Sequence, residues 1–270
     1  MAEGRTSHAY LFTGTRGTGK TTCAKILAKA VNCEHPVNGD PCCQCPSCVG
    51  LENGSFLDVL ELDAASNNGV DQVRALRDEA IYAPANVKKR VYIVDEVHML
   101  STAAFNALLK ILEEPPAHLM FILATTELHK VPATILSRCQ RYSFKRILPK
   151  DIAKRLTYVA QQEQIDLTPD GAELLSRLAD GALRDGLSLL DQCAAAGGTV
   201  DSRAVLEVLG LAGNLQTAQL MQDILDRNAQ AALLLLNELY AGGKDVGAVL
   251  GVVVLISTIV GEANFLDWGW

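Results

Sequence analysis

The segment GTRGTGKT, residues 14–21, most constrains what this chain can fold into. It matches the pattern G-x-x-x-x-G-K-[ST], in which glycines let backbone N–H groups surround phosphate oxygens at the start of a helix. The apolar run YLFT precedes it and the helical pattern AKILAKAV follows it. An ordinary glycine-rich turn is the alternative interpretation, but the strand, loop and helix context favours a phosphate-binding loop.

This loop predicts a site for the phosphates of a nucleotide. Lys20 is expected to reach the β- and γ-phosphates, and Thr21 is expected to offer its hydroxyl to Mg²⁺. The predicted nucleotide-binding residues are Gly14, Thr15, Arg16, Gly17, Thr18, Gly19, Lys20, Thr21 and Thr22.

Short apolar runs alternate with helical patterns over residues 10–145, which indicates an α/β fold: a parallel sheet with helices on its faces. One helical pattern is bounded by Ser101 as its N-cap and by Pro115–Pro116, which cannot continue a helix. The expected strands are Tyr10–Thr13, Asp58–Leu62, Val91–Val94, Met120–Thr125 and Arg141–Phe144, and the expected helices are Lys20–Val31, Val70–Ile81 and Thr102–Glu114.

Two carboxylates follow the apolar run VYIV, at the end of a strand where ligands bind in open α/β sheets. Asp95 suits the Mg²⁺ side of the site, and Glu96 suits the polarisation of an attacking water. Carboxylates at a strand end can also be merely solvated or cap a helix. Beside an intact phosphate loop, the catalytic interpretation is preferred.

Hydroxyls and one cation near the ends of two other predicted strands are weaker signals. Thr125 and Thr126 end the run MFILATT, where a hydroxyl can orient water, and Arg138 stands just before the last strand. On the residues alone, a lone arginine is usually a surface charge and a threonine in a strand usually packs. These interpretations therefore need further context.

The rear of the chain has a helical pattern. After Leu148–Pro149 the strand signals disappear, and leucines at helical spacing predict a small unit that ends near Gly197–Gly198. An alanine- and leucine-rich segment continues from Ser202. Residues 1–150 carry 17 Lys and Arg against 15 Asp and Glu, and residues 151–270 carry 7 against 16. Neither half is basic enough to predict nucleic-acid binding from charge alone.

The first ten residues lack the apolar core that a signal peptide needs, so a cytoplasmic location is expected. Val246–Gly261 runs without a charge, but a bilayer-spanning helix needs about twenty apolar residues. A buried C-terminal helix is the preferred interpretation, and no membrane partner is expected.

A cysteine cluster, CEHPVNGDPCCQCPSC over residues 33–48, holds five of the eight cysteines. In a reducing cytoplasm these are better interpreted as free thiols or metal ligands than as disulfides. The spacing C-x₈-C-x₂-C-x₂-C suits a tetrahedral structural zinc site with no open position. Cys43 is the candidate spare thiol, and His35 is the only nearby alternative ligand. The predicted zinc ligands are Cys33, Cys42, Cys45 and Cys48.

The motifs of this chain stand in a recognisable order. They are HAYLFTGTRGTGKT, the cysteine cluster, ELDAASNNGVD, VYIVDEVHMLS, FNALLKILEEPP, LATTELHKVPATILSRCQ and GALRDGLSLLDQ. In this order and spacing they closely resemble the gamma/tau subunits of bacterial DNA polymerase III, the AAA+ ATPases of the sliding-clamp loader. The resemblance runs from about Glu3 to about Leu250.

The resemblance implies roles for three residues. Arg138, in Ser137-Arg138-Cys139, resembles the arginine finger that acts in trans on ATP bound to a neighbouring subunit. Thr126 resembles the sensor-1 residue. Arg184 resembles sensor 2, which reaches from the helical lid toward the γ-phosphate of its own subunit; by itself Arg184 reads as an exposed helix cation. The implied catalytic set is Lys20, Asp95, Glu96, Thr126, Arg138 and Arg184.

The family also implies an architecture and an activity. Residues 1–147 correspond to an AAA+ ATPase domain with a zinc module at 33–48, residues 148–198 to a helical lid, and residues 199–270 to a partial helical collar. With ATP, Mg²⁺ and structural Zn²⁺, such a subunit hydrolyses ATP to ADP and phosphate and loads the β sliding clamp on primed DNA. The implied partners are other gamma/tau copies, delta, delta-prime, the β clamp and primer–template DNA.

The two ends of the chain depart from the family. Its members carry a longer segment before GRTSHAYLF, including an Arg-Pro stretch that packs on adenine, and GVVVLISTIVGEANFLDWGW does not resemble a collar helix. We therefore expect a sequence truncated at both ends.

Three alternative functions fit parts of the sequence. An ATP-binding scaffold without hydrolysis is favoured by the missing front segment and opposed by the intact Lys20, Asp95 and Glu96. A helicase or branch-migration motor is suggested by Asp95-Glu96-Val97-His98, but a helicase of that type needs a second motor domain. The phosphate loop argues against the third, a delta-prime subunit.

Overall fold

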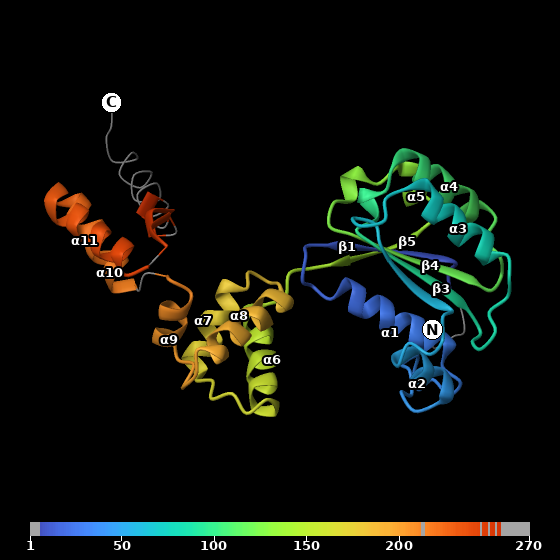
Figure 1. Ribbon diagram of the computed structural model, residues 1–270, viewed down its shortest axis with the longest axis horizontal. Helices are drawn as coiled ribbons and strands as arrows, with labels where there is room; N and C mark the ends of the chain where they lie inside the picture. Colours follow the sequence, from blue (N-terminus) through green and yellow to red (C-terminus); the bar gives the residue numbers. More distant parts are fainter. Residues whose placement is uncertain (1–5, 212–213, 244, 248, 252, 255–270) are drawn as a thin grey trace, which may run out of the picture. The chain divides into compact units, whose positions relative to one another are not determined.

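The structure is a computed structural model, and it describes residues 6–211, 214–243, 245–247, 249–251, 253 and 254. The chain forms two compact units that divide between Arg146 and Ile147. The first contains the sheet, and the described part of the second is helical (Figure 1).

A five-stranded parallel sheet forms the centre of the first unit, in the order β2-β3-β4-β1-β5. Since all strands run the same way, their carboxyl ends meet at one edge, and Gly14, Asp95 and Thr125 each end a strand there. The α/β fold and every expected strand are confirmed. The strands are β1 (Ala9–Gly14), β2 (Val59–Asp63), β3 (Arg90–Asp95), β4 (Leu119–Thr125) and β5 (Gln140–Phe144).

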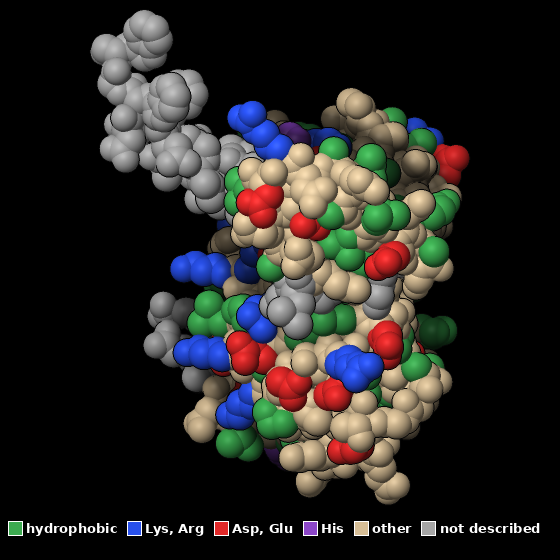
Figure 2. Space-filling view, turned by 90° about the vertical axis from the view of Figure 1, so that its left-hand side faces the viewer, with side chains coloured by type: hydrophobic (Ala, Val, Ile, Leu, Met, Phe, Trp, Pro, Cys, Tyr) green, Lys and Arg blue, Asp and Glu red, His purple; other side chains and the backbone are tan. Residues whose placement is uncertain are grey.

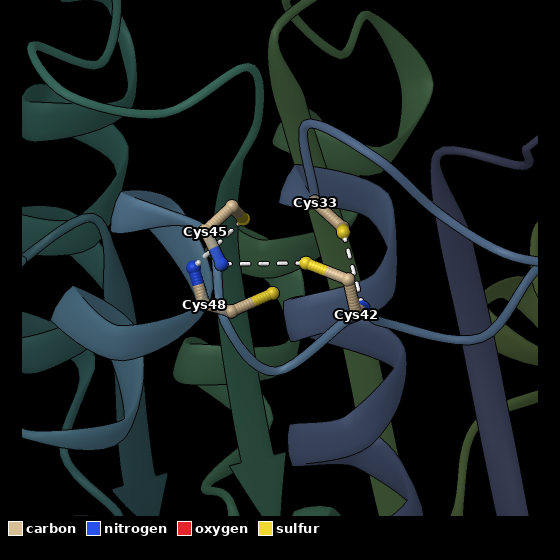
Figure 3. A group of neighbouring side chains, drawn as sticks. All are labelled: Cys33, Cys42, Cys45 and Cys48. Atoms are coloured by element: carbon tan, nitrogen blue, oxygen red, sulfur yellow. Dashed lines mark hydrogen bonds between the residues drawn. The ribbon is translucent and has the colours of Figure 1, made fainter.

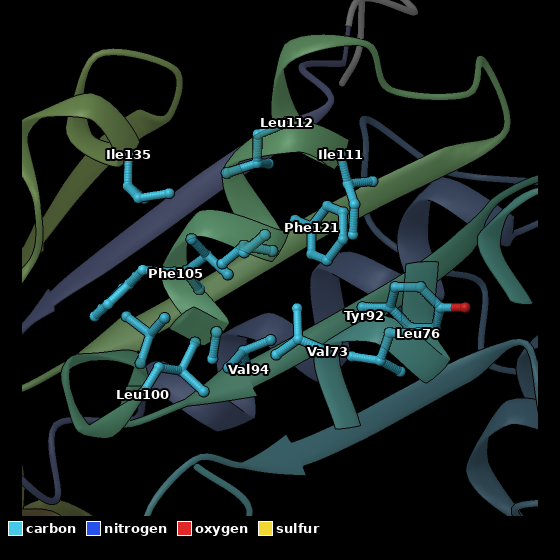
Figure 4. Close-up of a cluster of buried hydrophobic side chains, with 14 of the residues drawn as sticks. Val73, Leu76, Tyr92, Val94, Leu100, Phe105, Ile111, Leu112, Phe121 and Ile135 are labelled. Carbon is cyan, nitrogen blue, oxygen red and sulfur yellow. The ribbon is translucent and has the colours of Figure 1, made fainter. Parts of the chain in front are cut away.

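Helices cover both faces of this sheet. Successive side chains of a strand point to opposite faces, so Leu11 joins one core and its neighbour Phe12 joins the other. Helix α1 (Lys20–Asn32) packs on the face of Phe12, and α3 (Val70–Ala80) and α4 (Thr102–Glu113) cover the opposite face (Figures 1 and 4). This two-sided burial explains why the central strands read as continuous apolar runs.

The expected helices are confirmed to within one residue at each end. The N-cap is also confirmed, because Ser101 Oγ accepts a hydrogen bond from the Ala104 N–H at 3.2 Å. Four short elements were not predicted, because each holds too few residues for a helical period to show. They are α2 (Pro46–Glu52), η1 (Val97–Met99), η2 (Leu128–Lys130) and α5 (Ala133–Leu136).

The described part of the second unit is helical, as expected from its leucine spacing. One apolar cluster joins its first four helices through residues such as Ile152, Leu156 and Leu175. A second cluster, around Leu220 and Leu239, joins the two helices that follow to Val249 and Val253. The division into a lid and a collar stays a prediction. These helices are α6 (Pro149–Gln162), α7 (Pro169–Leu178), α8 (Leu183–Ala195), α9 (Ser202–Val208), α10 (Asn214–Leu225) and α11 (Ala229–Ala241).

The expected C-terminal helix over Val246–Gly261 falls only partly on described residues. Val249 and Val253 are helical and buried, whereas residues 255–270 lie outside the described part of the chain. Among the described residues, no helix is both long and apolar enough to cross a membrane.

Candidate functional site

The phosphate loop links β1 to α1 through glycines with positive φ. Gly14 has φ 147°, and a Cβ placed there would collide with the carbonyl oxygen of Phe144 on β5. Gly17 and Gly19 have φ 74° and 90°, in the left-handed region that favours glycine. No side chain caps the N-terminus of α1. The first-turn N–H groups are therefore available to an anion, which the helix dipole also favours.

Lys20 folds back across this loop. Its Nζ donates to the carbonyls of Gly14 and Thr15, both at 2.9 Å, and the residue is only 6% exposed. Burial lowers the pKa of Lys20, and the nearby carboxylates of Glu96 and Asp95 oppose that shift. The ammonium group thus lies within the loop that would surround the phosphates.

Thr21 and Asp95 meet across the strand edge. The Thr21 hydroxyl donates to Asp95 Oδ2 at 2.7 Å, and Asp95 Oδ1 accepts the Glu96 N–H at 2.9 Å. A hydroxyl and a carboxylate at this distance supply the oxygen ligands that Mg²⁺ prefers beside a phosphate. The two residues predicted to hold Mg²⁺ therefore lie together, and their chemistry fits the ion.

Glu96 lies in a conformation that a glutamate rarely adopts. Its backbone has φ 46° and ψ 45°, which costs roughly 1–3 kcal/mol and is typical of functional sites. The side chain points to the end of β4, where its Oε2 accepts the Thr126 hydroxyl at 2.8 Å and the Thr126 N–H at 3.1 Å. The structure thus joins two predicted catalytic residues directly.

Thr125, which the sequence analysis named together with Thr126, has other partners than Glu96. It is fully buried, and its hydroxyl lies 3.0 Å from His98 Nδ1 and accepts the Glu127 N–H at 3.0 Å. His98 and Glu127 were not predicted. Their only sequence signal is position, since His98 closely follows the carboxylate pair and Glu127 directly follows the threonine pair.

Of the two predicted arginines, Arg138 belongs to the same compact unit as this constellation and Arg184 to the other. Arg138 follows α5, and its guanidinium donates to Glu113 Oε1 and to the Thr134 carbonyl, each at 2.7 Å. Arg184 is in the first turn of α8, in the second compact unit. Among the contacts of the described residues, Arg138 therefore bonds to Glu113 and Thr134 and not to the phosphate loop.

Four thiols of the cysteine cluster converge at the end of α1 (Figure 3). Their sulfur atoms all lie within 4.8 Å of one another. Backbone N–H groups donate to three of these sulfurs, at 3.3 to 3.4 Å. This is the donor set and spacing of a tetrahedral zinc–thiolate site. The residues are Cys33, Cys42, Cys45 and Cys48, the predicted set.

The thiols of this cluster differ in pKa. Backbone N–H groups, led by that of Glu34, lower the pKa of Cys45 to about 6, whereas burial raises the pKa of Cys48 to about 12. Four thiolates so close together would repel one another, and a bound zinc ion would offset that repulsion. Cys43 and His35, the spare thiol and the alternative ligand, are both exposed and outside the cluster.

Polar contacts not predicted from the sequence tie this module to the sheet. The buried amide of Asn32 donates to the Lys89 carbonyl at 3.0 Å and accepts the Lys89 N–H at 2.7 Å. Lys88 Nζ donates to the Cys33 carbonyl at 2.6 Å. The end of α1 is thereby fixed to the segment that enters β3, the strand that carries Asp95.

Fold and site together define a P-loop NTPase of the AAA+ class. Two solved structures of Thermotoga maritima RuvB, one described as the Holliday junction branch migration motor and one of a single-residue variant, match with TM-scores of 0.54 and 0.55. Each is 16% identical, and each match covers 90% of this chain and 77% of the RuvB chain. At this identity the likeness supports the fold alone.

Sequence comparison narrows the class to a family. Residues 1–147 match the family described as "DNA polymerase III, delta subunit", and residues 151–199 match "DNA polymerase III clamp loader subunit, ATPase lid domain". The chain is 52% identical over 240 residues to the Bacillus subtilis DNA polymerase III subunit tau and 46% over 251 residues to the Escherichia coli one. It is 41% identical over 251 residues to the gamma subunit of Buchnera aphidicola.

The chain belongs to the gamma/tau family of DNA polymerase III clamp-loader subunits, which confirms the resemblance seen in its motifs. The matches cover 88% to 93% of this chain. They cover 43% of the Bacillus subtilis tau subunit, 39% of the Escherichia coli one and 70% of the Buchnera aphidicola gamma subunit.

Proposed function

We propose that this chain is the ATPase subunit of the bacterial DNA polymerase III clamp loader, and that it loads the β sliding clamp on primed DNA. The observation that carries the proposal is one strand edge where the phosphate loop, Thr21–Asp95 and Glu96–Thr126 lie together, in a chain of the gamma/tau family.

Each residue of this edge has a part in hydrolysis. The loop N–H groups and Lys20 bind the β- and γ-phosphates of ATP. Thr21 and Asp95 hold Mg²⁺, which offsets phosphate charge. Glu96 orients the attacking water, and Thr126 holds the Glu96 carboxylate at 2.8 Å. Gly14 to Thr22 form the nucleotide-binding segment.

The two arginines complete the site from outside the loop. Arg138 lies at the surface, with its side chain 32% exposed, and its guanidinium is held by Glu113. This exposure supports a role in trans on ATP bound to a neighbouring subunit. Arg184 lies in the first turn of α8, and it serves as sensor 2 for the γ-phosphate of its own subunit. Both stabilise charge that develops on the transferred phosphoryl group.

Assembly is proposed through the rear helices. Hydrophobic side chains lie at the surface among charged ones on the face drawn in Figure 2. On α11, Leu233, Leu234 and Tyr240 are 66%, 58% and 76% exposed, which favours burial against other subunits. Residues 199–270 thus act as a collar and residues 148–198 as a lid. The partners are gamma/tau copies, delta, delta-prime, the β clamp and primer–template DNA, in the cytoplasm.

ATP turnover by the full chain tests this function. It is measured for the chain alone and for a mixture with delta, delta-prime, β clamp and primed DNA. We expect turnover that rises in the complete mixture. Failure to bind ATP in every mixture would overturn the proposal in favour of a scaffold, and turnover stimulated by DNA without the other subunits would favour an independent motor.

Replacing Arg138 with alanine is expected to lower turnover in the complete mixture by at least about tenfold, because a finger stabilises the transition-state charge of phosphoryl transfer. ATP binding by the same subunit should persist, since Arg138 bonds to Glu113 and not to the loop. Turnover and fluorescent-nucleotide binding are measured in parallel. Arg141→Ala, which removes an exposed cation from β5, is the matched control. Wild-type turnover by Arg138→Ala, or loss of ATP binding, would contradict the role in trans.

A further inference from the structure

A buried histidine lies between the catalytic glutamate and the end of the neighbouring strand. The His98 side chain is 6% exposed, and its ring reaches from η1 to the end of β4 and the segment that follows this strand. Its Nδ1 is 3.0 Å from Thr125 Oγ1 and 3.2 Å from Glu96 Oε2. On the other side, its Nε2 is 3.3 Å from Glu127 Oε1. One ring therefore reaches three polar side chains, on two segments.

The charge beyond Nε2 orients this ring. Glu127 Oε1 accepts a hydrogen bond from Lys130 Nζ at 3.0 Å. That bond is the main reason that the pKa of Glu127 is lowered, with smaller effects from His98 and His129. An ionised Glu127 is an acceptor only, so Nε2 faces it as a donor. The Nδ1 side is thereby left to Thr125 and Glu96.

The contacts at Nδ1 fall on the Glu96 carboxylate and on Thr125, the residue next to the one that holds this carboxylate. Thr126 supplies two donors to Glu96 Oε2, and its backbone directly follows Thr125, whose hydroxyl His98 contacts. Glu96 also sits in a left-handed conformation that its surroundings must maintain. A ring that contacts both the Glu96 carboxylate and Thr125 at the strand end keeps these two groups in fixed relative positions.

We propose that His98 is a positioning residue for ATP hydrolysis, which holds Glu96 and the Thr125–Thr126 strand end in the arrangement that orients the attacking water. The proposal rests on the proposed function. His98 bonds to neither the phosphate loop nor Thr21 among the contacts of the described residues, so it acts through Glu96 and leaves nucleotide binding to the loop.

The two ring nitrogens allow this role to be tested with a pair of amides. His98→Asn places an amide near the position of Nδ1 and retains the contacts to Thr125 and Glu96. His98→Gln places one near Nε2 and retains only the contact to Glu127. His98→Ala retains neither. We expect kcat to fall about tenfold or more in the Ala and Gln variants, because small misplacements of catalytic groups cost that much, and to recover largely in Asn.

Affinity for ATP separates positioning from general damage. Because the phosphate loop is untouched, the Kd for a fluorescent ATP analogue should stay within about twofold in all three variants. His129→Ala is the matched control. That exposed histidine also contacts Glu127, with its Nε2 3.6 Å from Glu127 Oε2, but it makes no contact with Glu96 among the described residues. It should turn over ATP at the parent rate.

Three outcomes would overturn the inference: parent kcat in His98→Ala, equal losses in the Asn and Gln variants, or a weakened Kd that explains the loss. If His98→Ala does not fold, as judged by circular dichroism, the comparison of Asn with Gln decides alone. Lys20→Ala, measured in parallel, separates the two proposals. Turnover that survives Lys20→Ala removes the proposed function, whereas turnover abolished by Lys20→Ala but unaffected at His98 removes only this inference.

Discussion

Lys20→Ala is expected to lower ATP turnover by about 10²–10³-fold or more, the cost of removing one aligned donor from developing transition-state charge. The Nζ of the buried Lys20 donates to the carbonyls of Gly14 and Thr15. No other lysine lies in the segment from Gly14 to Thr22. Truncation to alanine removes that cation while the glycine-shaped backbone remains. Turnover by the complete loader mixture, with a parallel measurement of ATP affinity, checks this expectation.

Lys25→Ala provides the matched control on the same helix. Lys25 pairs with Glu61 at 2.6 Å, but its side chain is 58% exposed. Exposed ion pairs typically contribute only about 0–1 kcal/mol, so the variant should retain both turnover and fold. Equal rates for Lys20→Ala and Lys25→Ala would show that the observed turnover does not arise at this loop.

Loss of zinc is the second large expected effect. The parent chain should contain about one equivalent of zinc, and Cys45→Ser should lose it, because a closed structural site needs all four thiolates. Binding at such sites is worth about 10–16 kcal/mol of folding free energy at neutral pH. The short segment around α2 should therefore unfold locally. Metal analysis and limited proteolysis over residues 34–56 measure the two results.

Cys43→Ser is the control for this experiment, since Cys43 is exposed and its thiol donates to the Pro41 carbonyl, at 3.6 Å, rather than joining the four converging sulfurs. It should retain the metal and the protease resistance of the parent. Zinc retained by Cys45→Ser and lost from Cys43→Ser would reverse the ligand assignment. A parent chain that contains no zinc would overturn the assignment of these cysteines as zinc ligands.

Much of the fold could be predicted because its signals are local and long. The run Val91–Val94 is apolar at every position because helices cover both faces of β3, and a strand buried on both faces must be continuous in this way. Helix α4 carries its own boundaries in Ser101 and the prolines that follow. The turns of η1 and α5 carry no comparable period, and their positions depend on the packing around them.

The site divides in the same way. The phosphate loop, Asp95 and Glu96 could be predicted, because each belongs to a short motif that directly follows a predicted strand. The contacts of His98 with Thr125 and Glu127 could not, because 27 positions separate His98 from Thr125. They meet only because β3 and β4 are neighbours in the sheet.

By itself, the sequence determined the nucleotide loop, the carboxylate pair, the four-thiol spacing and the gamma/tau family, since the spacing of residues along the chain specifies each of them. Only the tertiary structure decided that Glu96 rests on Thr126, that His98 links them to Glu127, and that Arg138 is paired with Glu113. Those contacts depend on strand order and on the conformation of short turns, which many distant residues set together through packing.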